Sequence, residues 1–532
     1  MSEALDWAQG VVVASVYDSG ASLAFAAAPD QLFTATEINE WAWQAAAVDC
    51  LRLPLPHAPG HPATWDFDSA LHTLRLLAVE EACPIAMALM GQASRHGLPA
   101  FFDEGGLSIG AGHGSRSWTR AELQSVLPEV DWSSLRDVPT VLVTGSNGKT
   151  TTVRLLAAMA AAAGLPPGFN CTDGVFIAGE QVAQGDYSGP AGARTVLRDR
   201  RVHAAILETA RGGILRRGLA ASHANAAIVT NVSADHFGEY GVHDLSSLAA
   251  AKLVVARAID SSGVLVVNAD DPVLSAEAAK LLCPLAWFSL DDAHPLLVSH
   301  RNANGSTCGI VDGVLNLHVS GIDHPLGAID AMPLAFGGAA TYNQSNLAGA
   351  ALTAACVGLP VEAIARVLSS FGAVRTDNPG RLEHWNVGGS QVLLDYAHNP
   401  EGLTGLLAVA ADLRARSGGR LGLLLGQAGN RDDEAIRALA RAAASSRPDF
   451  VVLKDLEGYL RGREDGEVPA LLRAELSSLG IPDSSLLTVL PEVAAAQAML
   501  EWARPGDVVV LPVHNLSARA ALVDWLDARR AG

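Results

Sequence analysis

The stretch with the clearest potential for chemistry is residues 144–152, which read T-G-S-N-G-K-T-T-T. Gly145 and Gly148, with Asn147 between them, allow backbone N–H groups to approach an anion closely. Lys149 adds a cation at the same place. The residue types and their spacing therefore predict a phosphate-binding loop.

The elements that must position this loop are a predicted buried strand over 138–143 and a predicted helix over 153–163 that stops at Gly164. A helix N-terminus presents unpaired N–H groups and a positive dipole end to a phosphate. The hydroxyl of Thr150 can join the shell of a magnesium ion that bridges the β- and γ-phosphates. The strict spacing G-x-x-x-x-G-K-[ST] is not met, because Val143 stands at the first glycine position. The alternative interpretation is a strand–helix turn with a surface lysine.

Strands and helices alternate from residue 138 onward, which predicts an α/β fold with a mostly parallel sheet in a P-loop-type central domain. Predicted strands over 204–209, 226–230 and 264–271 each end in polar residues. The carboxyl ends of parallel strands line the ligand crevice, so these side chains should gather near the loop. They are Glu208, Asn231, Asp235, His236, Asn268 and Asp270. Glu208 and His236 could complete a second magnesium site.

Length and charge limit the classes of protein to consider. The 532 residues favour about three domains, which we place at 1–137, 138–376 and 377–532. A net charge of −19 argues against a general nucleic-acid binder. Six cysteines without a C-x-x-C pair are typical of reduced thiols in a cytoplasmic protein. We see no signal-peptide pattern and no apolar run of membrane-spanning length, so no membrane partner is expected.

The two flanking regions differ in how clearly they can be interpreted. The first is predicted to be a smaller α+β domain of unclear role, with a strand over 10–15, a capped helix that begins at Thr34 and a helix over 66–86. Its loop histidines, His57, His61 and His113, are either metal ligands or solvated side chains. The last region is predicted to be a Rossmann-like C-terminal domain, with strands over 391–394, 421–425, 450–453 and 508–512.

Several motifs in fixed order resemble the Mur ligase superfamily over residues 138–532. Besides the phosphate-binding loop they are L-E-T-A-R-G-G-I-L-R-R-G-L at 207–219, T-N-V-S-A-D-H-F-G at 230–238, N-A-D-D-P at 268–272, P-G-R-L-E at 379–383, D-Y-A-H-N-P at 395–400 and G-N-R-D-D at 429–433. Within the superfamily, 210–219 and L-R-G-R-E-D-G-E at 460–467 resemble the carboxy-terminal half of cyanophycin synthetases. The ATP-grasp domain of those enzymes has no counterpart between residues 137 and 138.

The resemblance implies an ADP-forming ligase that joins a carboxylate to an amine of an amino acid or short peptide through an acyl phosphate. ATP and Mg²⁺ are the implied cofactors. The implied ATP-binding residues are Gly145, Asn147, Gly148, Lys149, Thr150, Thr151, Asn268, Asn343, Arg381 and Asp395, where Asn268 and Asn343 flank the adenine and Asp395 takes the ribose. The implied catalytic residues are Lys149, Glu208, His236 and Lys252, and the implied metal ligands are Thr150, Glu208, His236 and Lys252, the last as a carbamate.

Alternatives stay open for two of these residues. Lys252 falls in a predicted helical stretch over 249–259 and could instead be a solvated helix lysine. Asn343 lies in T-Y-N-Q-S-N at 341–346, which resembles the family motif H-N-x-x-N with Tyr342 in place of histidine, and it could instead cap the helix predicted to follow.

Arginines supply the candidate substrate site. Arg211, Arg216 and Arg217, spaced by paired glycines, bring guanidinium groups next to the strand that ends at Glu208 and suit a substrate carboxylate. They could instead pair with an acidic surface. The other candidates are His398 and Asn399, which the resemblance places near the phosphates, Arg431, and Arg461 and Arg463, which could also belong to a surface loop.

Two function classes remain from the sequence. The first is an active amide ligase, possessing the full set of implied catalytic residues. The second is a nucleotide-binding partner or regulatory module that has lost ligase activity and works through its N-terminal domain. The sequence leaves the acid, the amine, the number of additions and the oligomeric state open, a homo-oligomer included.

Overall fold

The computed structural model describes residues 1–7, 11–17, 20–52, 66–124, 127–235 and 237–530. The chain divides into two compact units. Unit 1 comprises Met1–Val138 with the short segments Leu197–Arg201 and Phe237–His243, and unit 2 comprises the rest. The three-domain division predicted from the sequence stays a prediction. Within the described ranges, no helix is long and apolar enough to cross a membrane.

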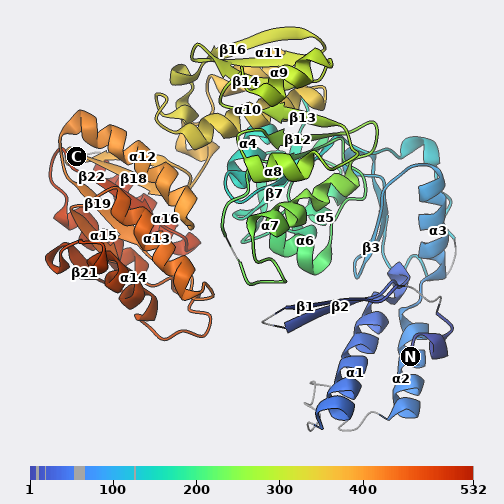
Figure 1. The fold of residues 1–532 in the computed structure, drawn as a ribbon. Helices are drawn as coiled ribbons and strands as arrows, with labels where there is room; N and C mark the ends of the chain where they lie inside the picture. Colours follow the sequence, from blue (N-terminus) through green and yellow to red (C-terminus); the bar gives the residue numbers. More distant parts are fainter. Residues whose placement is uncertain (8–10, 18–19, 53–65, 125–126, 236, 531–532) are drawn as a thin grey trace. The chain divides into compact units, whose positions relative to one another are not determined.

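Unit 1 is a mixed α and β structure (Figure 1). Its helices are α1 (Leu32–Leu51), α2 (Phe67–Glu81) and α3 (Pro84–Arg95), with 3₁₀ turns at Glu3–Leu5, Pro29–Gln31, Gly112–Gly114 and Trp132–Ser134. Its strands are β1 (Val13–Tyr17) and β2 (Gly20–Ala24), which form an antiparallel ribbon, and β3 (Ala100–Asp103), β4 (Gly106–Ile109) and β5 (Arg116–Trp118), which form a second antiparallel sheet. A small core between α3 and this second sheet includes Leu89, Leu107 and Trp118.

Two predictions for unit 1 are wrong in their boundaries. The helix predicted to begin at Thr34 begins at Leu32, because the carboxylate of Glu81 accepts the N–H groups of Phe33 and Thr34 and replaces a local cap. The helix predicted over 66–86 is two helices, since Pro84 lacks an N–H and begins α3 as its first residue.

The candidate histidine ligands of this region gain no support. His57 and His61 lie outside the described residues. His113 lies in the 3₁₀ turn Gly112–Gly114. No group of three or more His, Cys, Asp or Glu side chains in the described part of the chain is arranged to hold a metal ion.

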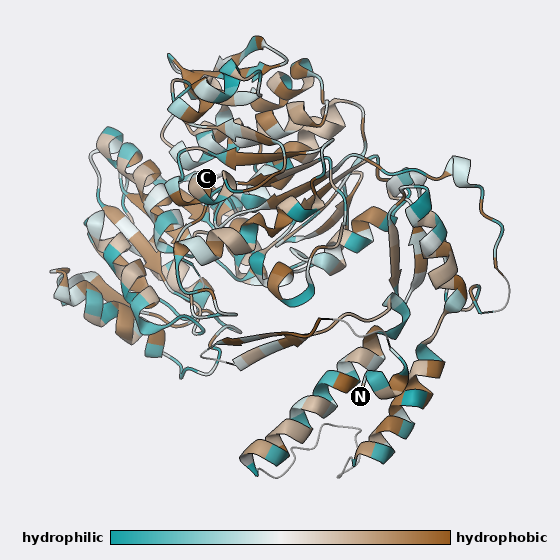
Figure 2. Ribbon diagram, turned by 45° about the vertical axis from the view of Figure 1, so that its right-hand side comes forward, coloured by the Kyte–Doolittle hydropathy of each residue, from teal (hydrophilic) through white to brown (hydrophobic). Residues whose placement is uncertain are grey.

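Unit 2 is built on two large sheets. The first has eleven strands in the order β16-β15-β14-β13-β12-β11-β6-β10-β7-β8-β9, parallel from β14 to β7 and antiparallel at both edges. Its strands are β6 (Thr140–Thr144), β7 (Pro167–Cys171), β8 (Gly174–Ile177), β9 (Glu180–Gln184), β10 (Ala204–Glu208), β11 (Ala226–Val229), β12 (Val264–Asn268), β13 (Leu285–Phe288), β14 (Thr307–Val311), β15 (Val314–Val319) and β16 (Ile322–Ala328). Figure 2 shows hydrophobic colouring along these central strands, and every residue of β6, β10 and β11 is buried, as expected for a parallel sheet covered on both faces.

Eight helices belong to the described part of the chain that forms this sheet. They are α4 (Lys149–Ala162), α5 (Pro190–Arg198), α6 (Arg211–Arg217), α7 (Leu245–Lys252), α8 (Pro272–Ala278), α9 (Pro295–Asn302), α10 (Thr341–Cys356) and α11 (Val361–Leu368), with 3₁₀ turns at Leu253–Ala258, Ile329–Ala331, Pro333–Ala335 and Arg375–Asp377. Helices α10 and α11 both pack on α4. Strand β6 lies between β10 and β11, so the chain leaves it at the point where the strand order reverses, which is where α/β sheets bind ligands.

The second sheet has six strands in the order β17-β18-β22-β19-β20-β21. They are β17 (Glu383–Val387), β18 (Ser390–Asp395), β19 (Leu421–Leu425), β20 (Phe450–Leu453), β21 (Leu486–Thr488) and β22 (Val508–Pro512), and all pairs except β17–β18 are parallel. Helices α12 (Pro400–Ser417), α13 (Asp433–Ser445), α14 (Glu467–Ser478), α15 (Glu492–Trp502) and α16 (Leu516–Arg530) connect them, with a 3₁₀ turn at Asp483–Ser485. The α/β class, with a second Rossmann-like sheet and a smaller N-terminal part, is confirmed.

Candidate active site

The glycines of residues 144–152 are required by the space around them. Gly145 has φ +151°, and a Cβ there would lie 1.9 Å from Thr230 Oγ1. Gly148 has φ +83°, and a Cβ there would lie 2.1 Å from Asn346 Oδ1. Gly148 is also the N-cap of α4 and offers no capping side chain, so the first N–H groups of α4 are left for an anion.

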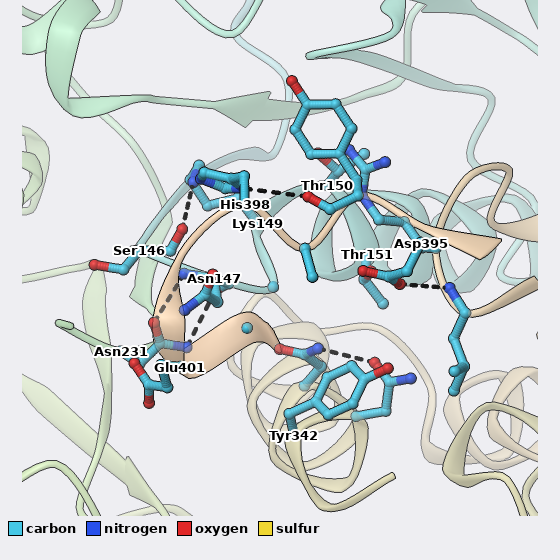
Figure 3. A pocket seen from close by; sticks show the side chains of 18 of the residues that line it. Ser146, Asn147, Lys149, Thr150, Thr151, Asn231, Tyr342, Asp395, His398 and Glu401 are labelled. Carbon is cyan, nitrogen blue, oxygen red and sulfur yellow. Dashed lines mark hydrogen bonds between the residues drawn. The ribbon is translucent and has the colours of Figure 1, made fainter. Parts of the chain in front are cut away.

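Neighbouring strands hold this loop in shape (Figure 3). Asn231 Oδ1 accepts the N–H of Asn147 at 2.9 Å, and Thr230 Oγ1 donates to the carbonyl oxygen of Asn147 at 2.6 Å. Lys149 Nζ donates to the carbonyl oxygen of Ser146 at 3.0 Å, which folds the ammonium back over the loop. The loop is thus preformed, with its cation directed at its own concave face.

A buried carboxylate faces the start of α4. Glu208, the last residue of β10, is 1% exposed, and its Oε2 accepts the hydroxyl of Thr150 at 2.8 Å. Burial raises the pKa of Glu208, while the Lys149 cation and the Thr150 hydroxyl act in the opposite direction. A hydroxyl and a carboxylate in contact, beside a phosphate-binding loop, are the oxygen donors that Mg²⁺ prefers, so these residues fit that ion.

Lys252 is the last residue of α7 and not an early residue of a longer helix, because a 3₁₀ turn follows it. The side chain is buried, at 4% exposure, which contradicts the interpretation as a solvated helix lysine. Burial lowers the pKa of Lys252 well below its ordinary value, and the cations of Lys149 and Arg211 lower it further, against an opposing effect of Asp235. His236, the other implied metal ligand, lies outside the described residues.

A pocket of about 140 Å³, open in part to solvent, extends from the loop toward the second sheet. Its lining comes from both sheets: residues 146–151, Thr172, Glu208, Asn231, Tyr342, Asn343, Asn346, Arg381, Leu382, Asp395, Tyr396, Ala397, His398, Glu401 and Gly402. Of the predicted ATP-binding residues, Gly145 and Asn268 are the ones outside this lining.

Asp395 and Arg381 form the far wall of the pocket. Asp395 ends β18 and accepts the N–H of Leu382 at 2.6 Å. Burial raises the pKa of Asp395, and the Arg381 cation opposes that effect. The Arg381 guanidinium lies 4.5 Å above the ring of Tyr396. Two of the carboxylates that line the pocket, Glu208 and Asp395, therefore each have a cation near them.

The two asparagines predicted to flank the adenine make hydrogen bonds within the protein, and their role at the adenine stays a prediction. Asn343 is inside α10, which begins at Thr341, so the helix-cap alternative is wrong. Asn343 Nδ2 donates to the carbonyl oxygen of Leu334, and Asn343 Oδ1 accepts from Asn346 Nδ2, both at 3.1 Å. Asn268 Nδ2 donates to the carbonyl oxygen of Thr230 at 3.0 Å and so supports the loop from behind.

The three arginines that follow Glu208 in the sequence differ in their exposure to solvent. Arg211 is the first residue of α6 and is buried, at 7% exposure. Arg216 and Arg217 are exposed, and Arg216 Nε donates to the carbonyl oxygen of Gly212 at 2.9 Å. Of the three arginines, Arg211 is therefore the buried one, and its cation acts on the Lys252 ammonium.

The remaining substrate candidates take two kinds of position. Asn399 Nδ2 donates to Asn147 Oδ1 at 2.9 Å, which links it to the phosphate-binding loop. His398 Nε2 and an Arg431 guanidinium nitrogen lie 3.5 Å and 2.8 Å from the carboxylate of Asp235.

Arg461 and Arg463 have separate roles. Arg463 pairs with Asp433 and Glu467 and donates to the carbonyl oxygens of Gly429 and Arg431, so it fixes the G-N-R-D-D loop. Arg461 is exposed and lies over the ring of Tyr459.

Sequence reasoning missed several residues of the pocket lining, of which three are Asn346, Tyr396 and Tyr342. Asn346 is the second asparagine of the N-x-x-N pattern and faces Gly148, a spacing that could have indicated it. Tyr396 directly follows Asp395 in the ribose-type motif. Tyr342 stands at the histidine position of the family motif, and it lies on the pocket wall (Figure 3).

The regions that contain the two large sheets both match known protein families. Residues 143–354 match the family model of the Mur ligase middle domain, and residues 380–512 match that of the Mur ligase, glutamate ligase domain. Cyanophycin synthetase of Trichormus variabilis is 35% identical over 387 residues, which is 73% of this chain and 42% of that protein. The chain therefore spans less than half the length of this relative.

Two further matches extend the comparison. UDP-N-acetylmuramoyl-L-alanyl-D-glutamate–2,6-diaminopimelate ligase of Corynebacterium glutamicum is 28% identical over 409 residues, 74% of this chain and 73% of that one. The structure of Mycobacterium tuberculosis folylpolyglutamate synthase complexed with ADP aligns with a TM-score of 0.52 and 20% identity, over 73% of this chain and 90% of that one. The match to the folylpolyglutamate synthase structure shows that the two proteins share a fold.

Proposed function

Because the chain belongs to the Mur ligase superfamily, as its motifs predicted, we propose that it is an ATP-dependent amide ligase. The reaction joins a carboxylate to the amine of an amino acid or short peptide and releases ADP and phosphate. The observation that carries the proposal is the pair Thr150–Glu208 at the N-terminus of α4, beside Lys149 and in one pocket with Asp395.

The nucleotide is assigned to the pocket along its length. The N–H groups of residues 148–150 and the Lys149 ammonium would hold the β- and γ-phosphates, and Asp395 would take the ribose. Arg381 lies within electrostatic range of both Glu208 and Asp395, so it can offset charge near the phosphates. Thr150 and Glu208 would hold Mg²⁺, which supplies charge neutralisation at the phosphates.

The reaction follows in two displacements. An oxygen of the substrate carboxylate attacks the γ-phosphorus, the bond from that phosphorus to the β,γ-bridging oxygen breaks, and ADP leaves. The amine nitrogen then attacks the acyl carbon, the C–N bond forms, the C–O bond to phosphate breaks, and the nitrogen loses a proton. The protein contributes alignment and electrostatic stabilisation, which the preformed loop and its fixed cation suit.

Two residues are carried over from the family as part of this proposal. Lys252 is assigned the carbamate role, since carbamylation needs a neutral amine and burial favours the neutral amine here. Arg211, at the buried start of α6, is assigned to a substrate carboxylate, with Arg216 at the exposed end of the same helix. The likeness to cyanophycin synthetase favours aspartate, glutamate or arginine as substrates.

The test is ADP release by purified protein with Mg-ATP across a matrix of amino acids and dipeptides, with mass spectrometry of the products. A product lighter than an acid–amine pair by one water establishes the ligase. Lys149→Ala and Glu208→Gln should each lower the rate by about a hundredfold or more with the fold intact. Lys280→Ala, an exposed lysine paired with Glu277, is the matched control and should change nothing. ATP binding without ADP release for any pair would favour a nucleotide-binding module.

A further inference from the structure

Tyr342 carries a buried hydroxyl for which the described residues supply no hydrogen-bond partner. The residue is the second of α10 and lines the same pocket as Asp395 (Figure 3). A buried hydroxyl that makes no hydrogen bond destabilises a protein. Such a group on a pocket wall is therefore explained if a ligand satisfies it.

The ring of Tyr342 is held in place by the second sheet's helices. It packs on the hydrophobic core that contains Leu403, Leu406 and Leu407 of α12. A Cβ at Gly405 would lie 2.9 Å from Tyr342 Cδ1, so the glycine makes room for the ring. Because the ring fills this space, its hydroxyl has a fixed position at the pocket and is not a mobile surface group.

Asp395 is the charged group that acts on this hydroxyl. Burial raises the pKa of Tyr342 well above its ordinary value, and the Asp395 carboxylate raises it further. The phenol therefore stays protonated and can donate. The described structure has no hydrogen bond between the phenol and the carboxylate, although both line the same pocket.

A ligand group that lies between a phenol donor and a carboxylate acceptor must accept one hydrogen bond and donate another. A hydroxyl does both, whereas a phosphate oxygen only accepts and an exocyclic amine only donates readily. The ribose of a nucleotide carries two adjacent hydroxyls. The chemistry of the two protein groups thus selects a sugar hydroxyl.

We propose that the Tyr342 hydroxyl donates a hydrogen bond to a ribose hydroxyl of the bound nucleotide, which in turn donates to Asp395. Tyr342 is then a specificity residue that favours ribonucleotides over deoxyribonucleotides. The inference rests on the proposed function only in that ATP occupies this pocket.

The test measures equilibrium Kd values by calorimetry for ATP, 2′-deoxy-ATP and 3′-deoxy-ATP, with Mg²⁺ and without substrates. The proteins are the wild type, Tyr342→Phe and the matched control Tyr459→Phe, whose tyrosine is 41% exposed. We expect Tyr342→Phe to weaken ATP about tenfold and to leave the affinity for one of the two deoxynucleotides unchanged. The control should match the wild type for all three ligands.

Thermal unfolding of the nucleotide-free proteins supplies a second readout. Tyr342→Phe removes a hydroxyl that has no protein partner, so its Tm should equal or exceed that of the wild type. Unchanged ATP affinity in Tyr342→Phe, an equal loss for all three nucleotides, or a lowered Tm without nucleotide each overturns the inference while the ligase proposal stands. A wild type with no affinity for any of the nucleotides overturns both.

Discussion

Replacing Glu492 by glutamine should destabilise the part of unit 2 that contains the six-stranded sheet. Lys454, after β20, and Glu492, the first residue of α15, are both 0% exposed and form an ion pair. Glu492 also accepts the N–H groups of His514 and Asn515, each at 3.1 Å. Glutamine keeps the shape but has only one acceptor oxygen, so the substitution removes the charge and one of these two backbone hydrogen bonds. It leaves a buried ammonium without its carboxylate partner.

The magnitude follows from that buried charge. Breaking one side of a buried pair typically costs about 3–5 kcal/mol. Burial lowers the pKa of Lys454 and Glu492 raises it, so the variant lysine should lose its proton in the folded state. The unfolded chain then binds one proton more than the folded chain, and stability should rise with pH by about 1.4 kcal/mol per unit below the unfolded lysine pKa.

Hydrogen exchange of the amides in β22, followed from pH 6 to 8, reports the opening free energy of this sheet without unfolding the whole chain. The double variant Glu492→Gln with Lys454→Met should recover most of the loss, because it removes both charges. Glu277→Gln, which breaks the exposed pair with Lys280, should cost less than about 1 kcal/mol. A Glu492→Gln variant within about 1 kcal/mol of the wild type, without the added pH slope, would refute the reasoning.

Two further predictions concern the nucleotide site, each with a control inside the chain. Gly148→Ala places a Cβ 2.1 Å from Asn346 Oδ1 and should weaken ATP binding at least about tenfold, as measured by calorimetry. Gly164 is the control, because it has a similar φ but open space around it. Gly164→Ala should cost about 1 kcal/mol of stability and leave ATP binding unchanged. Arg463→Ala should lower the turnover of the proposed ligase reaction, because it loosens the G-N-R-D-D loop. Arg461→Ala should leave the turnover unchanged. Equal effects of the two substitutions would instead favour direct substrate binding by both arginines.

Much of the fold of residues 138–532 could be predicted, because parallel strands buried on both faces appear as continuous apolar runs. The strands over 421–425, 450–453 and 508–512 have the predicted boundaries. Boundaries were missed where a distant side chain decides them. The start of α1 is set by Glu81, forty-seven positions from Thr34. Lys454 follows an apolar strand and carries no local sign that its ammonium is buried.

In the candidate site, too, local features could be predicted and features set by distant residues could not. Residues 144–152 could be predicted because a loop and the following helix make an anion site by themselves. The place of Tyr342 on the pocket wall could not be predicted from the sequence. Its ring occupies space left by Gly405, and its hydroxyl is influenced by the charge of Asp395, and both residues are distant in the sequence. The hydrogen bonds of Asn343 to Leu334 and Asn346 could not be predicted either, because they depend on how α10 packs, and its role at the adenine stays a prediction.

The segment between the two sheets explains why the pocket needs both of them. Asn378 Nδ2 donates to Thr151 Oγ1 in α4 at 3.2 Å, and four residues later the N–H of Leu382 donates to Asp395 at 2.6 Å. Arg381, between these two contacts, acts electrostatically on both Glu208 and Asp395. One short segment thus connects the end of the pocket at α4 to the end at Asp395. A nucleotide that contacts both ends should therefore stabilise the contact between the sheets, because its two halves are held by residues that the same segment ties together.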